Sequence, residues 1–193
     1  MTRIAIVTGS TRPGRRGDQV TRWVESAARA RGEAEFAVLD LADFHLPLLD
    51  EPQPAAIGEY RNPHTGTWAD AVAGFDGFVF VTPEYNHSMP AALKNAIDYL
   101  FAEWNDKAAG FVSYGLTGGT RAVEHLRLTL AEVKVACVRS QVSLSLFSDF
   151  RIADMSEPGE FRPGEHHEPL LERLFDEVIA WAEALRSLRE PVT

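Results

Sequence analysis

Two polar loops hold the residues of this chain whose types and spacing could do chemistry. The segment GSTRPGRRGD, residues 9–18, combines the hydroxyls of Ser10 and Thr11 with three arginines. The segment PEYN, residues 83–86, offers a rigid turn, a flat aromatic side chain and backbone amides. Each loop directly follows a short apolar run, RIAIVT or GFVFVT. We therefore expect the first loop to bind an anion and the second to support a planar heteroaromatic ring.

A phosphate monoester suits the first loop better than a nucleotide does. A helix N-terminus offers unpaired N–H groups and the positive end of a dipole, and clustered arginines need a dianion or carboxylates nearby. The P-loop pattern does not match because Arg15 and Arg16 stand where that pattern needs Lys and a hydroxyl residue. The pattern G-x-G-x-x-G does not match either, because Thr11 stands where its second Gly should be. The alternative is a solvated loop, because 16 of the 19 cationic residues are Arg and the bias looks genomic.

A third loop, SYGLTGGT at residues 113–120, adds three glycines that let backbone approach a ligand closely. Its alternative interpretation is tight-turn chemistry alone. Lys94, Asn95 and Asp98 lie within a predicted helix, where we expect them to brace loops or an interface.

Alternating apolar runs and helical periodicity predict the elements that position these loops. We expect strands at 3–8, 34–41, 77–82, 108–115 and within 135–147, and helices at 17–31, 68–73, after a Ser88 cap, 118–133 and 168–188. Residues 42–66 and 148–167 are predicted loops. The last helix should bury one apolar stripe, formed by Leu170, Leu171, Leu174, Phe175, Val178, Trp181, Ala182 and Leu185.

This alternation is typical of an α/β fold with a parallel sheet and helices on both faces. Five units favour a flavodoxin-like three-layer sandwich with a five-stranded parallel sheet of order 2-1-3-4-5. In that order the first and third strands are neighbours, so the loops at 9–18 and 82–89 should meet in one crevice. We expect residues 1–193 to form a single domain of this type.

Composition excludes several classes of function. The formal charge of −9 argues against nucleic acid or an anionic membrane as partner. The lone Cys137 cannot form an intramolecular disulfide and is expected to be a buried structural thiol, which suits a cytoplasmic location. No apolar run approaches 18 residues, so we expect neither a membrane span nor a signal peptide.

The strings GSTRPGRRG, PEYNHSMPAALKNAIDYL and SYGLTGGTRA resemble the NADPH-dependent FMN reductase family, which includes quinone, chromate and azo-dye reductases. The similarity covers about residues 3–145. It implies that the first loop holds the FMN phosphate, the second lies along the isoalloxazine and the third closes the site. The cofactor-binding candidates are Gly9, Ser10, Thr11, Arg12, Arg15, Arg16, Gly17, Asp18, Pro83, Glu84, Tyr85, Asn86, Tyr114, Gly115 and Gly118.

The resemblance implies hydride transfer from NADPH, or NADH, through FMN to a small acceptor such as a quinone, free flavin, azo compound or metal oxyanion. One crevice in a single domain favours ping-pong kinetics, and we assign no catalytic side chain and no metal. The resemblance also implies a homodimer or homotetramer. Tyr99, Phe101 and Trp104 are candidates for its interface, or else for the core of the monomer.

Two rival functions remain open. A flavodoxin-type electron carrier would share the fold but would not oxidise NADPH by itself. A serine hydrolase would use Ser113 with downstream Asp and His residues, although Phe111 stands where the nucleophile elbow needs Gly. The residues that would complete such a triad after Ser113 are Asp149, Asp154, His166 and His167. His166, His167 and Glu168 could also be interpreted as metal ligands, but we expect them to lie in a solvated loop. His87 is either a substrate contact or a surface residue.

Overall fold

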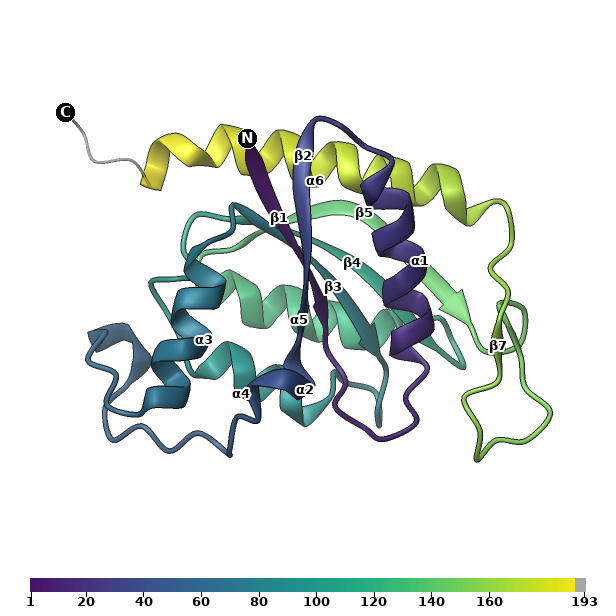
Figure 1. The fold of residues 1–193 in the computed structure, drawn as a ribbon, viewed down its shortest axis with the longest axis horizontal. Helices are drawn as coiled ribbons and strands as arrows, with labels where there is room; N and C mark the ends of the chain where they lie inside the picture. Colours follow the sequence, from purple (N-terminus) through teal and green to yellow (C-terminus); the bar gives the residue numbers. More distant parts are fainter. Residues whose placement is uncertain (190–193) are drawn as a thin grey trace.

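A twisted sheet of five parallel strands forms the centre of the molecule in a computed structural model that describes residues 1–189 (Figure 1). Its strand order is β2-β1-β3-β4-β5, which confirms the predicted order and the flavodoxin-like fold class. The central strands β1, β3 and β4 are almost fully buried, as expected for a sheet covered on both faces, whereas the edge strands β2 and β5 are mostly half-buried. Their bounds are Thr2–Thr8 (β1), Ala34–Asp40 (β2), Gly77–Pro83 (β3), Ala108–Gly115 (β4) and Ala136–Ser145 (β5).

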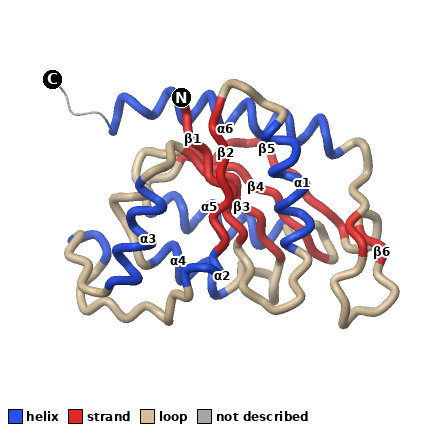
Figure 2. The backbone as a smooth tube through the Cα atoms, in the orientation of Figure 1, coloured by secondary structure: helices blue, strands red, loops and turns tan. Residues whose placement is uncertain are grey.

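Helices cover both faces of the sheet. Helices α1 (Gly17–Arg29) and α6 (His167–Arg189) pack on one face, where Val20 and Leu174 join a core with Ile4. The short α2 (Leu41–Phe44), α3 (Pro63–Ala73), α4 (Ala91–Asp98) and α5 (Thr120–Glu132) cover the other, with a 3-10 turn at Ala55–Ile57. The carboxyl ends of the strands therefore open onto loops at one edge of the sheet (Figure 2).

Three local predictions were wrong. Helix α3 begins at Pro63, earlier than position 68, because a proline in the first turn lacks only an N–H that would have no partner there. Ser88 does not cap α4; Pro90 holds the N-cap position, and the Ser88 hydroxyl lies 2.9 Å from Nδ1 of His125. Residues 148–167 include a small antiparallel hairpin formed by β6 (Phe150–Arg151) and β7 (Glu160–Phe161).

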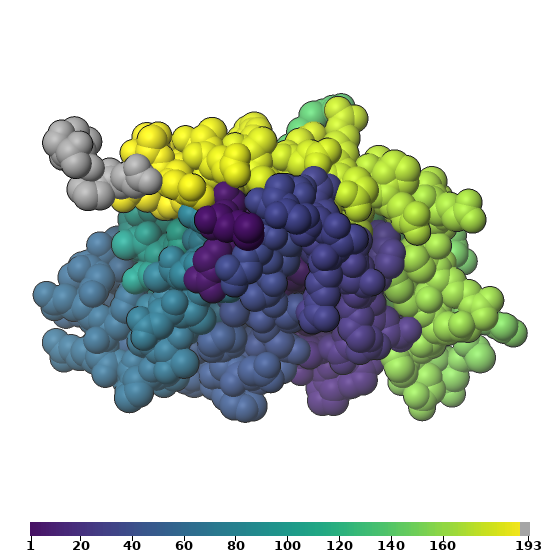
Figure 3. Space-filling view, turned by 45° about the horizontal axis from the view of Figure 1, so that its top comes forward, coloured from purple at the N-terminus to yellow at the C-terminus, as the bar shows by residue number. Residues whose placement is uncertain are grey.

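Helix α6 buries a narrower stripe than its apolar residues suggested. Leu170 and Trp181 are 43% and 45% exposed, which contradicts their predicted place in the stripe. The helix runs as a long ridge along the face shown in Figure 3, so one of its sides meets solvent. The buried apolar residues of α6 are Leu171, Leu174, Phe175, Val178, Ile179 and Ala182.

The aromatic residues near the end of α4 belong to the monomer core. Tyr99 and Trp104 are fully buried, and the Trp104 ring lies 4.9 Å from Phe78 in an edge-to-face arrangement. Phe101 is partly buried against the same core. Of the two alternatives, packing within the monomer is therefore realised. Within residues 1–189, the helices are all too short or too polar to cross a bilayer.

Candidate functional site

The first and second loops meet at the carboxyl edge of the sheet. The Ser10 hydroxyl and the Tyr85 phenol form a hydrogen bond of 3.0 Å across 75 positions of sequence, and Gly9 N donates to Val81 O at 2.9 Å. Beside this contact lies a cavity of about 260 Å³. Its lining residues are Arg12, Gly14, Arg15, Arg16, Tyr85, Tyr114, Gly115, Leu116, Leu146 and Met155.

Not every predicted cofactor residue lines this cavity. Thr11 lines a separate cavity of about 460 Å³ between α2 and α4, and Asp18 lines a third beside Asp40. The remaining candidates are absent from the lining of both this cavity and the other two; they are Gly9, Ser10, Gly17, Pro83, Glu84, Asn86 and Gly118. Direct contact of any of the fifteen with a cofactor stays a prediction.

The three arginines of the first loop have different surroundings. Arg15 is only 10% exposed and forms ion pairs with Asp18 and Asp40, with 2.5 Å between Arg15 Nε and Asp18 Oδ1. Burial lowers the pKa of Arg15, but hydrogen bonds to Asp40 and Asp18 outweigh burial and raise the pKa above its ordinary value. Arg15 also donates to the Ser10 carbonyl. These contacts fix the shape of the loop, so the charge of Arg15 is already balanced.

Arg12 and Arg16 make fewer contacts with other protein groups than Arg15 does. Arg12 is exposed at the cavity, and it has no ion pair with any residue that the structure describes. Arg16 Nη2 donates to Glu157 O at 2.8 Å, while its buried Nε has no hydrogen-bond partner among the described residues. None of the described side chains caps the N-terminus of α1. Uncapped N–H groups, an arginine without a carboxylate and an unsatisfied donor are what a phosphate dianion requires, so the residues present fit such a group.

The second loop is a two-residue turn of the mirror-image type. Tyr85 N donates to Ser88 O at 2.8 Å and Ser88 N to Tyr85 O at 3.0 Å. The φ angles of Asn86 and His87 are 49° and 68°, as a type I′ turn requires. Asn and His are both enriched in this left-handed region compared with most other residues, so both central residues suit the turn. The turn projects Tyr85 back toward the first loop.

Arg121 connects the second and third loops, although sequence reasoning missed it. Its Nε donates to Glu84 Oε1 at 2.6 Å, and its backbone N–H donates to Glu84 Oε2 at 3.1 Å. Its two terminal nitrogens lie 2.9 Å from His87 Nε2 and 2.9 Å from Thr117 Oγ1. Since Arg121 can only donate, His87 Nε2 accepts and carries no proton in this arrangement. The Glu84 side chain is 7% exposed, so we infer that it anchors the loop.

The third loop closes against the other two. Glu84 N donates to Tyr114 O at 3.1 Å, and Tyr114 is buried, which raises the pKa of its phenol well above the ordinary value. A Cβ added to Gly17 would lie 2.9 Å from the Tyr114 hydroxyl, so the end of the Tyr114 side chain packs directly against the first residue of α1. Gly118 and Gly119 have φ angles of 74° and 71°, a conformation that favours glycine.

The hydrolase constellation does not form. The Ser113 hydroxyl is buried and donates to Gly118 O at 2.6 Å. His167 is buried and pairs with Asp149 at 3.0 Å, contrary to the expectation that it is solvated. Cys137 is half-buried rather than fully buried as predicted, and its burial raises the pKa of the thiol to about 11, which suits a structural thiol. Among residues 1–189, no group of three His, Cys, Asp or Glu side chains is arranged to hold a metal ion.

Comparisons with known proteins agree with this geometry. A family model described as NADPH-dependent FMN reductase matches residues 2–149. A protein from Nectria sp. named NAD(P)H-dependent FMN reductase is 40% identical over 136 residues, 67% of this chain and 68% of that protein. A Schizosaccharomyces pombe protein of the same designation is 35% identical over 158 residues, 81% and 79% of the two chains.

Among solved structures, the Paracoccus denitrificans flavoenzyme NAD(P)H:(acceptor) oxidoreductase FerB superposes with a TM-score of 0.71. That likeness covers 95% of this chain and 98% of FerB at 22% identity, and it supports the fold alone. The family match spans more than three quarters of the chain and includes all three loops. The chain belongs to the NADPH-dependent FMN reductase family of oxidoreductases.

Proposed function

We propose that this chain binds FMN and uses NADPH, or NADH, to reduce a small acceptor such as a quinone, free flavin, azo compound or metal oxyanion. Bound FMN supplies the chemistry, since it can accept hydride from a nicotinamide and pass it on. The observation that carries the proposal is the 3.0 Å contact between Ser10 and Tyr85. That contact brings the arginine loop and the aromatic loop to one cavity.

The residues of the chain act by binding and positioning. Arg12, Arg16 and the first N–H groups of α1 bind the phosphate dianion, in a protein whose net charge of −9 would otherwise repel it. Tyr85 and the 114–115 backbone flank the flavin ring, and Arg15 holds the first loop in shape. No side chain needs to donate or accept a proton for hydride transfer to occur.

NADPH and acceptor occupy the same exposed face in turn, so the kinetics are ping-pong. Initial rates measured over a matrix of NADPH and quinone concentrations should give parallel double-reciprocal lines. Intersecting lines would show that both substrates bind together and would refute this part of the proposal. A set of quinones, flavins and azo compounds, compared by kcat/KM, would identify the preferred acceptor class.

Flavin content and anaerobic reduction test the central assignment. The purified protein, or the protein reconstituted with FMN, should show flavin absorption, and NADPH alone should bleach it. The alternative is a flavodoxin-type electron carrier, which would hold FMN but would not be bleached by NADPH without a partner protein. A wild-type chain that binds no FMN would refute both functions.

We propose a homodimer or homotetramer as the working assembly, because the flavin face needs walls that one chain does not complete. Tyr99 and Trp104 are buried in the monomer, so other residues would have to form the interface. Exposed Leu128, in a groove between α4 and α5, is one candidate. Sedimentation of the FMN-loaded protein as a 21.4 kDa particle would refute this assembly.

A further inference from the structure

The hairpin at residues 148–162 forms one wall of the proposed flavin cavity. Met155, between its two strands, lines the same cavity as Tyr85 and the arginines of the first loop. All but the first two residues of this hairpin lie beyond residues 2–149, which the family model matches. The contacts of the hairpin are therefore argued from this structure alone.

The base of the hairpin is firmly packed. Phe150 and Phe161, one from each strand, have ring centroids 5.0 Å apart, and Phe161 meets Trp23 of α1 at 5.7 Å. Phe150 also lies 6.2 Å from Tyr114 in the cavity wall. Asp149 is 2% exposed, accepts from the backbone of residues 145 and 164, and pairs with His167. These contacts fix where the hairpin leaves the sheet.

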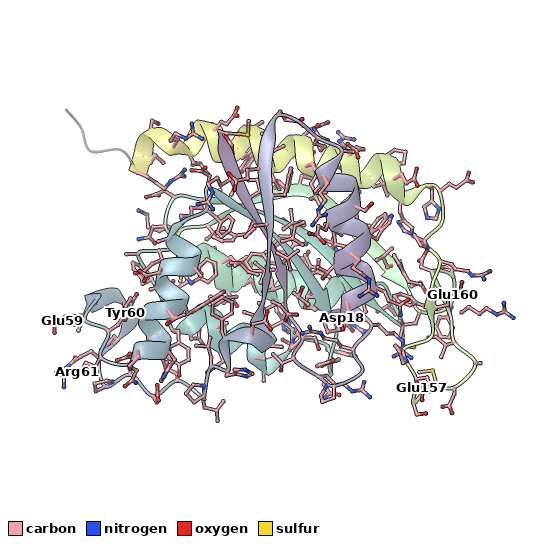
Figure 4. The ribbon with its side chains drawn as sticks, in the orientation of Figure 1. Asp18, Glu59, Tyr60, Arg61, Glu157 and Glu160 are labelled. Atoms are coloured by element: carbon pink, nitrogen blue, oxygen red, sulfur yellow. The ribbon has the colours of Figure 1, made fainter. Side chains whose placement is uncertain are left out.

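The outer part of the hairpin depends on the first turn of α1. Gln19 Nε2 donates to Gly159 O at 2.9 Å, and Gln19 Oε1 accepts from Phe161 N at 2.9 Å. Arg16 Nη2 adds a bond of 2.8 Å to Glu157 O. In Figure 4, Asp18 marks this turn, and Glu157 and Glu160 mark the hairpin beside it. The first turn of α1, which we propose as the phosphate site, therefore also holds the hairpin in place.

We propose that Gln19 is a positioning residue that holds the hairpin against the flavin cavity and thereby slows FMN release. The inference rests on the proposed function, and it makes FMN a resident cofactor that stays bound from one turnover to the next. Gln19 is absent from the cavity lining, so it acts only through the hairpin. A wall that must open before the ligand leaves affects the dissociation rate more than the association rate.

Two substitutions test the coupling from opposite sides. Gln19→Met keeps the length of the side chain and removes both hydrogen bonds. Gly159→Ala acts from the hairpin, because Gly159 has a φ of 71° and its added Cβ would lie 2.8 Å from Arg151 O. Ser26→Ala on the exposed side of α1 is the matched control. The readouts are FMN dissociation after rapid dilution, followed by flavin fluorescence, and limited proteolysis of the loaded protein within residues 148–162.

Both test variants should release FMN about tenfold faster than wild type, as expected when two backbone groups lose their partners. Both should also be cut in the hairpin while FMN is still bound, and Ser26→Ala should match wild type. Urea unfolding of the FMN-free proteins should show that both variants are still folded under the conditions of the release assay, which separates this effect from global unfolding. A hairpin that becomes cleavable while FMN release stays unchanged would overturn the inference and leave the proposed function intact. A wild-type protein that binds no FMN would refute both.

Discussion

Replacing Arg121 by Gln should loosen the two loops that flank the flavin cavity. Arg121 is 43% exposed, but the Glu84 carboxylate that it pairs with is only 7% exposed. A hydrogen bond to a charged group contributes about 1.5–3 kcal/mol, and the exposure of Arg121 places this pair in the lower half of that range. The Glu84 carboxylate would keep only the backbone N–H of residue 121. We therefore expect Arg121→Gln to lower the free energy of unfolding by about 2 kcal/mol.

Urea unfolding of the FMN-free protein measures that loss, and fluorescence titration with FMN measures its effect on binding. Arg121→Lys should be intermediate, because a single ammonium cannot reach Glu84, His87 and Thr117 together. Arg173→Gln is the matched control. The Arg173 side chain is 65% exposed and pairs with Glu177 on the same helix, so its loss should change the free energy of unfolding by less than about 1 kcal/mol. If Arg121→Gln matches the control in stability and in affinity for FMN, Arg121 does not hold the second and third loops together.

Three further outcomes follow from the structure. Arg12→Ala should weaken FMN binding about 10- to 100-fold in fluorescence titration, whereas Arg15→Ala should mainly lower the unfolding temperature, because Arg15 pairs with Asp18 and Asp40. Burial alone would raise the pKa of Asp149, but hydrogen bonds from backbone N–H groups and neighbouring side chains hold that pKa below its ordinary value. The stability that Asp149 contributes is therefore present above about pH 4 and lost below it, so urea midpoints of Asp149→Asn and wild type should converge on acidification. Cys137 should resist thiol reagents at pH 8 in the folded protein and react after unfolding, since burial raises its pKa to about 11.

The sheet and the meeting of the loops were predictable because their signals are local. Strands β1 and β3 are short apolar runs that end at Thr8 and Pro83, and the order of a doubly wound sheet then places the loops after them together. The confirmed strand order and the contact between Ser10 and Tyr85 follow from these signals.

Side-chain partners distant in sequence were not predictable in the same way. Contact of Arg15 with a ligand stays a prediction, but the sequence did not indicate that Asp40, 25 positions away, balances the charge of Arg15. The place of Glu84 in the ring site also stays a prediction, but the sequence did not indicate its partner Arg121, 37 positions away. Local sequence does not indicate either pairing. The role of Ser88 was misjudged because a serine before a helix resembles a cap, whereas here it closes the turn that begins at Tyr85.

The close approach of Gly17 to Tyr114 limits how this site can evolve. Any β-carbon at position 17 collides first with the phenol oxygen; without that oxygen, the nearest atoms would be Thr8 Cγ2 at 3.7 Å and Tyr114 Cζ at 3.8 Å, both ordinary contacts. Replacing Tyr114 by Phe would therefore open room for alanine at position 17, whereas alanine beside an intact Tyr114 would have to displace the buried phenol. The order in which the two positions change thus affects the stability of the intermediate protein.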